Sequence, residues 1–251
     1  MPRPTIGANV TALVVGGGSG IGEALASRLR ADGVDLVTWD VAGEHDVTCD
    51  ISDPSQVDEA MAATLARGPV PDQVTVTAGI GHSGLLLDLP ADEWDRVSGI
   101  NTKGVWLAMR AAARSMIDSG VMGSIVVVTS VSAHLVDRNM GLYCASKAAA
   151  DMLVKVAAHE WGEHGIRVNA VGPGVTRTPM LGRAKPGTAW LGPVERRTAL
   201  GRLGEADDIA EAIVAVHGLG WVTGQAIDVD GGLSLQSPID SFGWMKDQGL
   251  A

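Results

Sequence analysis

Apolar residues follow two spacings along this chain. Short, continuous apolar runs rich in β-branched residues predict strands, and they lie at 10–15, 34–39, 74–77, 124–129, 166–171 and 225–229. Longer stretches repeat their apolar residues at the spacing of a helix face, over 21–30, from Asp53-Pro54 onward, and over 91–117, 141–164 and 205–217. The pattern therefore predicts strands and helices in alternation.

The predicted strands are apolar along their whole length rather than at every second position. Strands of this kind are buried on both faces, which indicates a parallel sheet with helices on both sides, the doubly wound α/β class. No repeat, low-complexity linker or break in composition divides the chain, so we expect one domain over 1–251. Its least regular segment, about 177–202, contains Pro179, Pro186 and Pro193, and a long irregular connection of this kind favours a functional lid.

Composition excludes several classes of protein. Hydrophobic residues make up 46% and charged residues 19% of the 251 residues, which excludes a disordered chain. The formal net charge of −10 repels phosphate groups, so we expect neither nucleic acid nor an anionic membrane as a partner. We see no targeting or membrane-spanning segment, and the two cysteines, Cys49 and Cys144, suit a reducing compartment; these features favour a cytoplasmic protein.

A glycine-rich turn follows the first predicted strand and opens the first predicted helix. It reads Gly16-Gly17-Gly18-Ser19-Gly20-Ile21-Gly22. Glycine lets the backbone approach a pyrophosphate closely, and the helix start adds free N–H groups. Asp40 closes the second strand, where a carboxylate can accept a hydrogen bond from a ribose hydroxyl and repel a 2′-phosphate. An ordinary tight turn and a surface Asp40 are the alternative, but the strand–turn–helix context favours a dinucleotide, with NAD preferred over NADP.

The chain has one tyrosine, Tyr143, and Lys147 lies about one helical turn after it on the same predicted face. A free phenol is a poor base at neutral pH, but a neighbouring ammonium favours the phenolate and lowers the phenol pKa. Such a phenol can give or take the proton of an alcohol and its ketone. Ser130 closes the strand 124–129 at the carboxyl edge of the sheet, where it can hydrogen-bond the same oxygen.

With these residues the chain resembles the short-chain dehydrogenase/reductase family over nearly its whole length. The resemblance rests on segments spread along the sequence: Gly16-x-x-x-Gly20-x-Gly22, Asp50-Ile51, Asn101 in Ile-Asn-Thr-Lys-Gly, Ser130, Tyr143-x-x-x-Lys147, residues 167–174, and Asp230-Gly231-Gly232. It implies a seven-stranded, Rossmann-like sheet and an NAD-dependent oxidoreductase that interconverts a secondary alcohol and a ketone. It also implies a homo-oligomer, the family's usual tetramer, with helices 91–117 and 141–164 as interface elements.

The resemblance assigns roles to matching positions. Tyr143 would be the general acid/base, Ser130 would hold the substrate oxygen, and Asn101 would complete a proton relay. Lys147 would bind the nicotinamide ribose and lower the Tyr143 pKa. The expected cofactor contacts are Gly16, Ser19, Gly20, Ile21 and Gly22 along the pyrophosphate, Asp40 at the ribose, Asp50 and Ile51 beside the adenine, Ala78 and Gly79 after the fourth strand, Tyr143 and Lys147, and Pro173, Gly174, Thr176 and Thr178 at the nicotinamide end.

Two departures from the family pattern stand out. The family usually has Asn-Ala-Gly after the fourth strand, where this chain has Thr77-Ala78-Gly79. Thr77 must then tie the centre of the sheet with a single hydroxyl, or the site is rearranged. The connection from Asp40 to Asp50 is too short for the family's usual helix. Some members that act on hydroxysteroids or cyclic diols are similarly shortened, which hints at such a substrate.

The remaining candidates concern the substrate pocket and the tail. His82 and His134 follow strand ends, and Trp190 lies in the irregular segment; all three are candidates to line the pocket, against a solvated loop as the alternative. No histidine spacing predicts a metal site. The tail 237–251 carries Phe242, Trp244 and Met245, and we expect it to contact a neighbouring subunit.

Two other functions compete with an alcohol dehydrogenase. A 3-oxoacyl-thioester reductase of lipid metabolism would normally use NADPH and need a basic patch for an acidic carrier protein, so Asp40 and the net charge weigh against it. A non-catalytic NAD-binding regulator would not need a tuned pair such as Tyr143 and Lys147.

Overall fold

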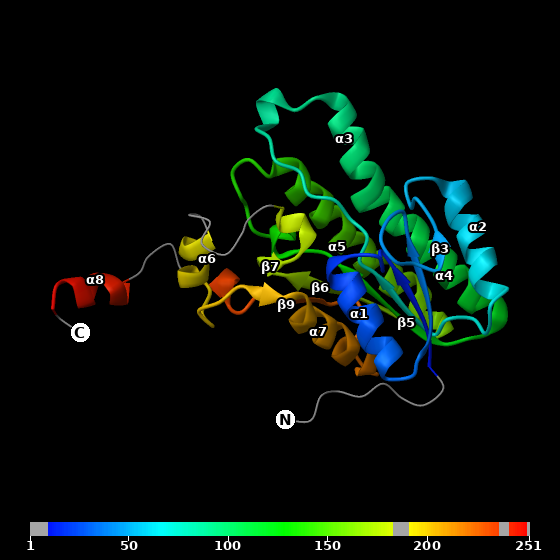
Figure 1. Ribbon diagram of the computed structural model, residues 1–251. Helices are drawn as coiled ribbons and strands as arrows, with labels where there is room; N and C mark the ends of the chain where they lie inside the picture. Colours follow the sequence, from blue (N-terminus) through cyan, green and yellow to red (C-terminus); the bar gives the residue numbers. More distant parts are fainter. Residues whose placement is uncertain (1–9, 183–190, 236–240, 250–251) are drawn as a thin grey trace.

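A seven-stranded parallel sheet lies at the centre of the computed structural model, which describes residues 10–182, 191–235 and 241–249 (Figure 1). The strand order is β3-β2-β1-β4-β5-β6-β9, and every neighbouring pair is parallel. The strands are β1 (Thr11–Val15), β2 (Asp35–Asp40), β3 (Val47–Thr48), β4 (Gln73–Val76), β5 (Gly123–Val128), β6 (Ile166–Pro173) and β9 (Ala226–Val229). The predicted doubly wound α/β class, as a single Rossmann-like domain, is therefore confirmed.

The order of the strands fixes where a ligand can bind. From β1 the chain runs to β2 and β3 on one side, and it then crosses to β4 on the other side of β1. Val15, the last residue of β1, pairs with Trp39 of β2 and with Val76 of β4, so these strands end together. Doubly wound sheets bind ligands at the carboxyl ends of the strands where the winding direction reverses, here between β1 and β4.

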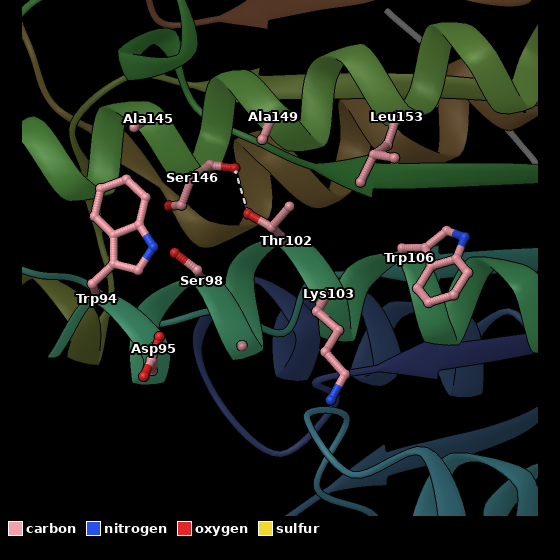
Figure 2. A pocket seen from close by; sticks show the side chains of 11 residues that line it. Trp94, Asp95, Ser98, Thr102, Lys103, Trp106, Ala145, Ser146, Ala149 and Leu153 are labelled. Carbon is pink, nitrogen blue, oxygen red and sulfur yellow. Dashed lines mark hydrogen bonds between the residues drawn. The ribbon is translucent and has the colours of Figure 1, made fainter. Parts of the chain in front are cut away.

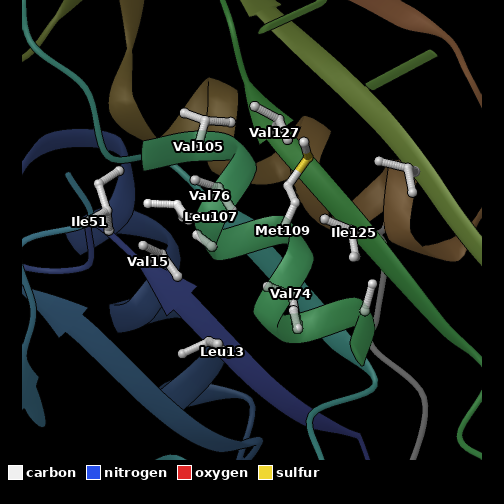
Figure 3. Packing of buried hydrophobic residues seen from close by; sticks show 14 of the residues in the cluster. Leu13, Val15, Ile51, Val74, Val76, Val105, Leu107, Met109, Ile125 and Val127 are labelled. Carbon is white, nitrogen blue, oxygen red and sulfur yellow. The ribbon is translucent and has the colours of Figure 1, made fainter. Parts of the chain in front are cut away.

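Helices cover both faces of the sheet. One apolar core joins the sheet to α2 (Pro54–Leu65), α4 (Val105–Ser119) and α5 (Gly141–Trp161). Leu107 and Met109 of α4 pack there against Val74 and Val76 of β4 (Figure 3). The opposite core joins the sheet to α1 (Gly20–Ala31) and α7 (Ala206–Gly218). Because successive strand residues point to opposite faces, this double burial explains why the strands are apolar throughout.

The helix expected over 91–117 is divided. It consists of α3 (Ala91–Ser98), a π-helical turn (Gly99–Gly104) and α4. Asn101 lies in the π-helical turn, and such turns are frequent at functional sites. The helix expected over 141–164 is α5, which ends at Trp161 and is followed by a short 3-10 turn, Gly162–His164.

The segment expected to be irregular, and several other connections, contain short elements. The segment 177–202 holds a 3-10 turn, Pro179–Leu181, and the helix α6 (Leu191–Arg197). A small separate ladder pairs β7 (Thr176–Arg177) with β8 (Gly204–Glu205). The tail forms α8 (Ser241–Asp247), which stands apart from the layered body in Figure 1. Further 3-10 turns lie at Leu86–Asp88, Val131–Ala133 and Leu233–Leu235.

Within the described part of the chain, no helix combines the length and the apolar character that crossing a membrane requires.

Candidate active site

The glycine turn lies at the reversal point of the sheet, between β1 and α1. Gly16 has φ +90°, a conformation that favours glycine, and a side chain on Gly22 would run into the carbonyl oxygen of Gly16. Ser19 is the exposed N-cap residue of α1, and its side chain makes no cap hydrogen bond. The turn therefore presents close-packed backbone and a helix N-terminus, the arrangement that suits a pyrophosphate.

Thr77 replaces the family's asparagine and ties the turn to β4. Its hydroxyl lies 3.0 Å from the carbonyl oxygen of Val15 and 2.9 Å from that of Gly16, and can donate to either. The backbone N–H groups of Thr77 and Ala78 donate to the same Val15 carbonyl, at 2.8 and 3.1 Å. One hydroxyl therefore links the ends of β1 and β4.

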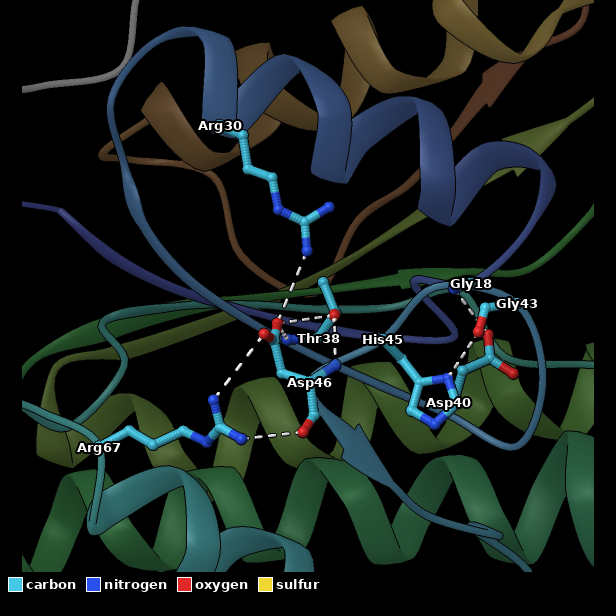
Figure 4. Close-up of polar contacts among 8 residues, drawn as sticks. All are labelled: Gly18, Arg30, Thr38, Asp40, Gly43, His45, Asp46 and Arg67. Atoms are coloured by element: carbon cyan, nitrogen blue, oxygen red, sulfur yellow. Dashed lines mark hydrogen bonds and ion pairs between the residues drawn. The ribbon is translucent and has the colours of Figure 1, made fainter.

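Asp40 lies at the end of β2, beside the same turn (Figure 4). Its Oδ2 accepts a hydrogen bond from the N–H of Gly18 at 2.8 Å. Its Oδ1 accepts from the N–H groups of Val41 and Ala42, at 2.7 and 3.2 Å. The carboxylate is thus held by backbone amides next to the glycine turn.

Asp50 and Ile51 follow β3 but differ in exposure. Asp50 Oδ1 accepts from the N–H and the hydroxyl of Ser52, at 2.9 and 2.7 Å. Ile51 is 4% exposed and packs in the core against Gly104. Contact of this pair with an adenine stays a prediction.

The proposed catalytic side chains converge on the N-terminal half of α5. The hydroxyl of Ser130, at the end of β5, makes a side-chain hydrogen bond with Tyr143. The ammonium of Lys147 lies 5.8 Å from the centre of the Tyr143 ring and donates to the carbonyl oxygen of Val128 at 3.1 Å. Both α5 side chains are buried. The structure thus brings Ser130, Tyr143 and Lys147 together.

The side chain of Asn101 joins this group through hydrogen bonds to Ile80 and Ser146. Its Oδ1 accepts from the N–H of Ile80 at 2.8 Å, and its Nδ2 donates to the Ile80 carbonyl at 2.9 Å and to Ser146 Oγ at 3.1 Å. Ser146 in turn donates to the carbonyl oxygen of Tyr143 at 2.8 Å. The amide of Asn101 is therefore engaged in holding the segment after β4 against α5.

Gly79 connects the two halves of the site. A Cβ atom placed on it would lie 3.2 Å from Lys147 Nζ and 3.3 Å from Asn101 Oδ1. The segment that begins with Thr77 at the glycine turn therefore continues directly to Lys147 and Asn101. One continuous edge of the sheet would therefore contact both ends of a bound dinucleotide.

Burial shifts the pKa values of both Tyr143 and Lys147. Burial lowers the pKa of Lys147 to about 8, and the carboxylate of Asp151 raises it in part. The pKa of Tyr143 is raised, first by burial, while Ser130 lowers it and Cys144 raises it further. The expected net lowering of the phenol pKa is thus wrong for the chain alone, because desolvation of the phenolate outweighs the hydrogen bond from Ser130.

The nicotinamide-end candidates lie around the end of β6. Gly174 donates to the carbonyl oxygen of Val229 at 3.1 Å, and the hydroxyl of Thr176 donates to the carbonyl of Gly174 at 3.0 Å. Thr178 lies against Gly20 of the glycine turn. Pro173 is the last residue of β6. This segment thus closes back onto the turn that it faces.

The two histidine candidates face carboxylates. His82 Nε2 lies 3.8 Å from Glu93 Oε2, and His134 Nε2 lies 3.0 Å from Asp228 Oδ2. Whether either imidazole lines a substrate pocket stays a prediction. Trp190 lies outside the described residues. In the described ranges, no group of three or more His, Cys, Asp or Glu is arranged to hold a metal ion.

Sequence reasoning missed two acidic residues near this site. Asp151 has one buried oxygen, Oδ1, without a hydrogen-bond partner, and its side chain also hydrogen-bonds Thr129. Burial raises the pKa of Asp151 and of Asp228. The position of Asp151, one further turn along the helix face of Tyr143 and Lys147, was the signal that could have identified it.

A cavity of about 650 Å³ lies beside the site, between α5 and the segment that runs from α3 through the π-helical turn to α4 (Figure 2). Trp94 and Trp106 line it on one side, and Ala149 and Leu153 of α5 on the other. The side chains of Ser130, Tyr143 and Lys147 do not line it. The cavity is therefore a surface feature of the helical layer.

Comparison with known proteins extends these observations. Residues 15–234 match a family model described as enoyl-(acyl carrier protein) reductase. The chain is 34% identical to the (3R)-3-hydroxyacyl-CoA dehydrogenase of Rattus norvegicus over 248 residues, which covers 88% of this chain and 95% of the relative. It is 36% identical to the 2,5-dichloro-2,5-cyclohexadiene-1,4-diol dehydrogenase of Sphingobium indicum over 241 residues, which covers 89% and 96%.

A solved structure agrees with this result. The gluconate 5-dehydrogenase of Burkholderia cenocepacia, in complex with NADP and tartrate, superposes with a TM-score of 0.86 at 29% identity, and the match covers 94% of this chain and 98% of the other. The sequence motifs, the doubly wound sheet and these matches agree, and the chain belongs to the short-chain dehydrogenase/reductase family.

Proposed function

We propose that this protein is an NAD-dependent dehydrogenase that interconverts a secondary alcohol and a ketone. The observation that carries the proposal is the convergence of Asn101, Ser130, Tyr143 and Lys147 at the carboxyl edge of the sheet, joined through Gly79 to the glycine turn. A binding protein without catalysis could use Lys147 to hold the nicotinamide ribose, but it would not need a buried phenol held between that lysine and Ser130. The buried Tyr143–Lys147 pair therefore favours an enzyme over an NAD-binding regulator.

Each catalytic side chain has a separate task in this proposal. The phenol of Tyr143 gives its proton to the substrate oxygen in one direction and takes it back in the other. Ser130 donates a hydrogen bond to the same oxygen and holds it next to the phenol. The ammonium of Lys147 stabilises the phenolate that forms, and Asn101 holds the segment after β4 in register with α5.

The residues present fit a dinucleotide, because the glycine turn has no room for side chains at Gly16 and Gly22 and leaves a helix N-terminus free. When bound, the nicotinamide supplies or accepts the hydride that the protein itself cannot provide. We propose NAD rather than NADP, because Asp40 has a carboxylate where a 2′-phosphate would have to lie. Because a solved structural relative binds NADP, the test of the proposal compares both cofactors.

The rim of the site suggests an apolar substrate. Exposed leucines at 85–87 and exposed aliphatic residues at 135–136 lie on two loops that are joined by a 2.8 Å hydrogen bond from Gly84 N–H to the Asn139 carbonyl. Met180, also exposed, lies against Gly81 near the same loops. Exposed apolar clusters of this kind mark ligand-binding surfaces. We therefore propose an alcohol with a bulky apolar ring, such as a cyclic diol or a hydroxysteroid.

An acyl thioester is the second candidate substrate. The identity to the (3R)-3-hydroxyacyl-CoA dehydrogenase favours it, since that relative's name describes a secondary alcohol on an acyl chain. The net charge of −10 weighs against an acidic carrier protein as the donor of the acyl chain.

We further propose a homo-oligomer, the family's tetramer, in the cytoplasm. The cavity over α3, α4 and α5 exposes Trp94 and Trp106, and Met152 and Val156 of α5 are also exposed. An apolar face of this size favours a second copy of the chain as its cover. The exposed Phe242 of α8 supports a further contact between subunits through the tail.

A substrate panel tests the proposal. Cyclic diols, hydroxysteroids and 3-hydroxyacyl-CoA esters are each incubated with NAD⁺ or NADP⁺, and the absorbance of the reduced nicotinamide is followed. The proposal predicts turnover of at least one cyclic or steroid alcohol, with NAD⁺ preferred. Turnover of 3-hydroxyacyl-CoA esters alone would favour the second candidate, and preference for NADP⁺ would contradict the cofactor assignment.

A further inference from the structure

The connection between β2 and β3 is short, and it is fastened at both ends. It consists of residues 41–46, and no helix forms in it. Asp46, the last of these residues, folds back onto β2 (Figure 4). Its Oδ2 accepts from the N–H of Thr38 at 2.9 Å and from the Thr38 hydroxyl at 2.8 Å. The N–H of Asp46 donates to the Thr38 carbonyl at 3.0 Å. The connection is thereby pinned to the middle of β2.

Two arginines, one in α1 and one just after α2, hold the same carboxylate. Arg30, near the end of α1, lies 3.6 Å from Asp46 Oδ2, and Arg67, after α2, lies 3.8 Å from Oδ1. Arg67 also donates to the backbone carbonyl of Asp46 at 2.9 Å. Figure 4 shows the two guanidinium groups reaching Asp46 from opposite sides. Asp46 therefore fixes the connection relative to both flanking helices.

The other end of the connection lies directly on the glycine turn. A side chain on Gly18 would run into the carbonyl oxygen of Ala42, and one on Gly43 would run into the carbonyl oxygen of Gly18. Two backbone segments that touch in this way can do so only while the connection is held down. A connection released from Asp46 would be free to lift away from Gly18.

Asp40 lies between these two fastenings. Its two oxygens accept three backbone N–H groups, from Gly18, Val41 and Ala42. A carboxylate offers about four acceptor positions, so one remains for an incoming hydroxyl. Val41 and Ala42 belong to the connection, so the direction in which Asp40 presents its free position depends on where the connection lies.

We propose that Asp46 is a positioning residue for cofactor selection: it holds the 41–46 connection against Gly18, and thereby aims the Asp40 carboxylate at the ribose. The inference rests on the proposed function, in which Asp40 reads that ribose. An aimed carboxylate accepts a hydrogen bond from a 2′-hydroxyl and repels a 2′-phosphate, whereas a mobile one does both less well. Asp46 thus acts on the cofactor through Asp40 without touching it.

The test compares binding of NADH and NADPH by nicotinamide fluorescence, which needs no turnover. For Asp46→Ala we expect the Kd for NADH to rise about tenfold, the size expected when one well-placed hydrogen bond is lost, and the Kd for NADPH to change about twofold or less. The ratio of the Kd for NADPH to the Kd for NADH therefore falls. Glu44→Ala is the matched control, because it removes the same charge from an exposed position in the same connection and should leave both Kd values unchanged.

A double variant separates positioning from mere stability. If Asp46 acts through Asp40, then Asp46→Ala adds no further change in the ratio in an Asp40→Ala background. Equal weakening of both cofactors by Asp46→Ala, or a full effect without Asp40, would overturn the inference. If Asp46→Ala does not fold, Arg67→Met keeps Asp46 but removes one fastening, and the ratio should fall in the same direction; an unchanged ratio would again overturn it.

Failure of the inference is distinguishable from failure of the proposed function. A wild-type protein that binds NADPH more tightly than NADH contradicts the cofactor assignment itself. A wild-type protein that prefers NADH, together with an Asp46→Ala variant of unchanged ratio, overturns only the role of Asp46.

Discussion

The Tyr143–Lys147 pair shows that the spacing of two residues can be predicted from the sequence, whereas the pKa that burial gives them cannot. The Tyr143–Lys147 spacing was predictable from the sequence, since it follows from the period of a helix. The direction of the Tyr143 pKa was not, because it depends on how much of the phenol is buried, and that is a property of the packed loops around it. Asp151 was missed for the same reason: the sequence does not reveal that one of its oxygens is buried without a partner.

Replacement of Asp151 by asparagine should move the alkaline side of the activity profile. The Asp151 carboxylate raises the pKa of Lys147, which burial holds at about 8, so without that carboxylate the ammonium loses its proton at lower pH. We expect turnover of Asp151→Asn to decline at a lower pH than turnover of the wild type, with little change in KM. The neighbours His134 and Lys155 of Asp151 are retained in this variant.

Glu160→Gln, an exposed acid on the same helix, is the control for this measurement and should keep the wild-type profile. An Asp151→Asn profile that coincides with the wild-type profile would show that Asp151 does not act on Lys147.

His217 predicts a loss of stability in acid. Its imidazole is buried, with Nε2 lying 2.9 Å from Thr75 Oγ1, and burial followed by the charge of Arg167 lowers its pKa from 6.5 to about 3. The unfolded chain takes up a proton below about pH 6.5 that the folded chain refuses, so this contribution is complete above that pH and is lost as the pH falls toward 3. At about pH 4.5 the loss amounts to about 2–3 kcal/mol.

Urea unfolding of the wild type and of His217→Gln at about pH 7 and pH 4.5 measures this contribution. The variant should lose less stability on acidification than the wild type. His164→Gln, which removes an exposed histidine, should lose as much as the wild type. Equal acid losses in His217→Gln and the wild type would contradict a neutral, buried His217.

At the scale of elements, the apolar runs of the sequence predicted β1, β2, β4, β5, β6 and β9 of the central sheet, whereas β3, with two residues, is too short to give such a run. The sequence also indicated that no helix would fit between Asp40 and Asp50, because too few residues separate them. It did not predict the π-helical turn, Gly99–Gly104, because apolar spacing alone does not identify the hydrogen-bond pattern of a single turn within a longer helical stretch. Short helices such as α6 and α8 were missed because so few turns give no clear period.

Thr77 joins two of these elements, and its hydroxyl should matter for both stability and cofactor binding. Thr77→Val keeps the shape of the side chain but removes the donor to the carbonyl oxygens of Val15 and Gly16. We expect a loss of about 1–2 kcal/mol in the free energy of unfolding, measured with urea, and weaker binding of NADH.

Thr77→Ser retains the hydroxyl and serves as the control, with stability and NADH affinity close to those of the wild type. If Thr77→Val matched the wild type in both measurements, the hydroxyl would not be what ties β4 to the glycine turn.

At the scale of the whole molecule, one face remains uncovered. The cavity lined by Trp94, Trp106 and Leu153 lies between α5 and the α3–α4 segment (Figure 2), and α5 also carries Tyr143 and Lys147, the proposed catalytic pair. A second copy on this face would stiffen the helix that holds Tyr143 and Lys147. The sequence suggested these helices as interfaces, but only the structure shows which of their side chains are exposed together.

A charge placed on this face should dissociate the oligomer. Trp94 is 48% exposed, and Trp94→Glu would bury an unpaired carboxylate in the proposed interface. Sedimentation analysis should find smaller particles than in the wild type. Trp221→Glu, at a fully exposed tryptophan away from the cavity, should leave the mass unchanged. A Trp94→Glu protein with the wild-type mass would contradict the interface.

The account as a whole depends on the phenol of Tyr143. The most direct test is the Tyr143→Phe variant, which removes one oxygen, assayed in parallel for alcohol oxidation with NAD⁺ and for NADH binding by fluorescence. The account predicts that turnover falls by about a hundredfold or more while the Kd for NADH stays within about twofold of the wild type. Turnover at the wild-type rate in the Tyr143→Phe variant would contradict it.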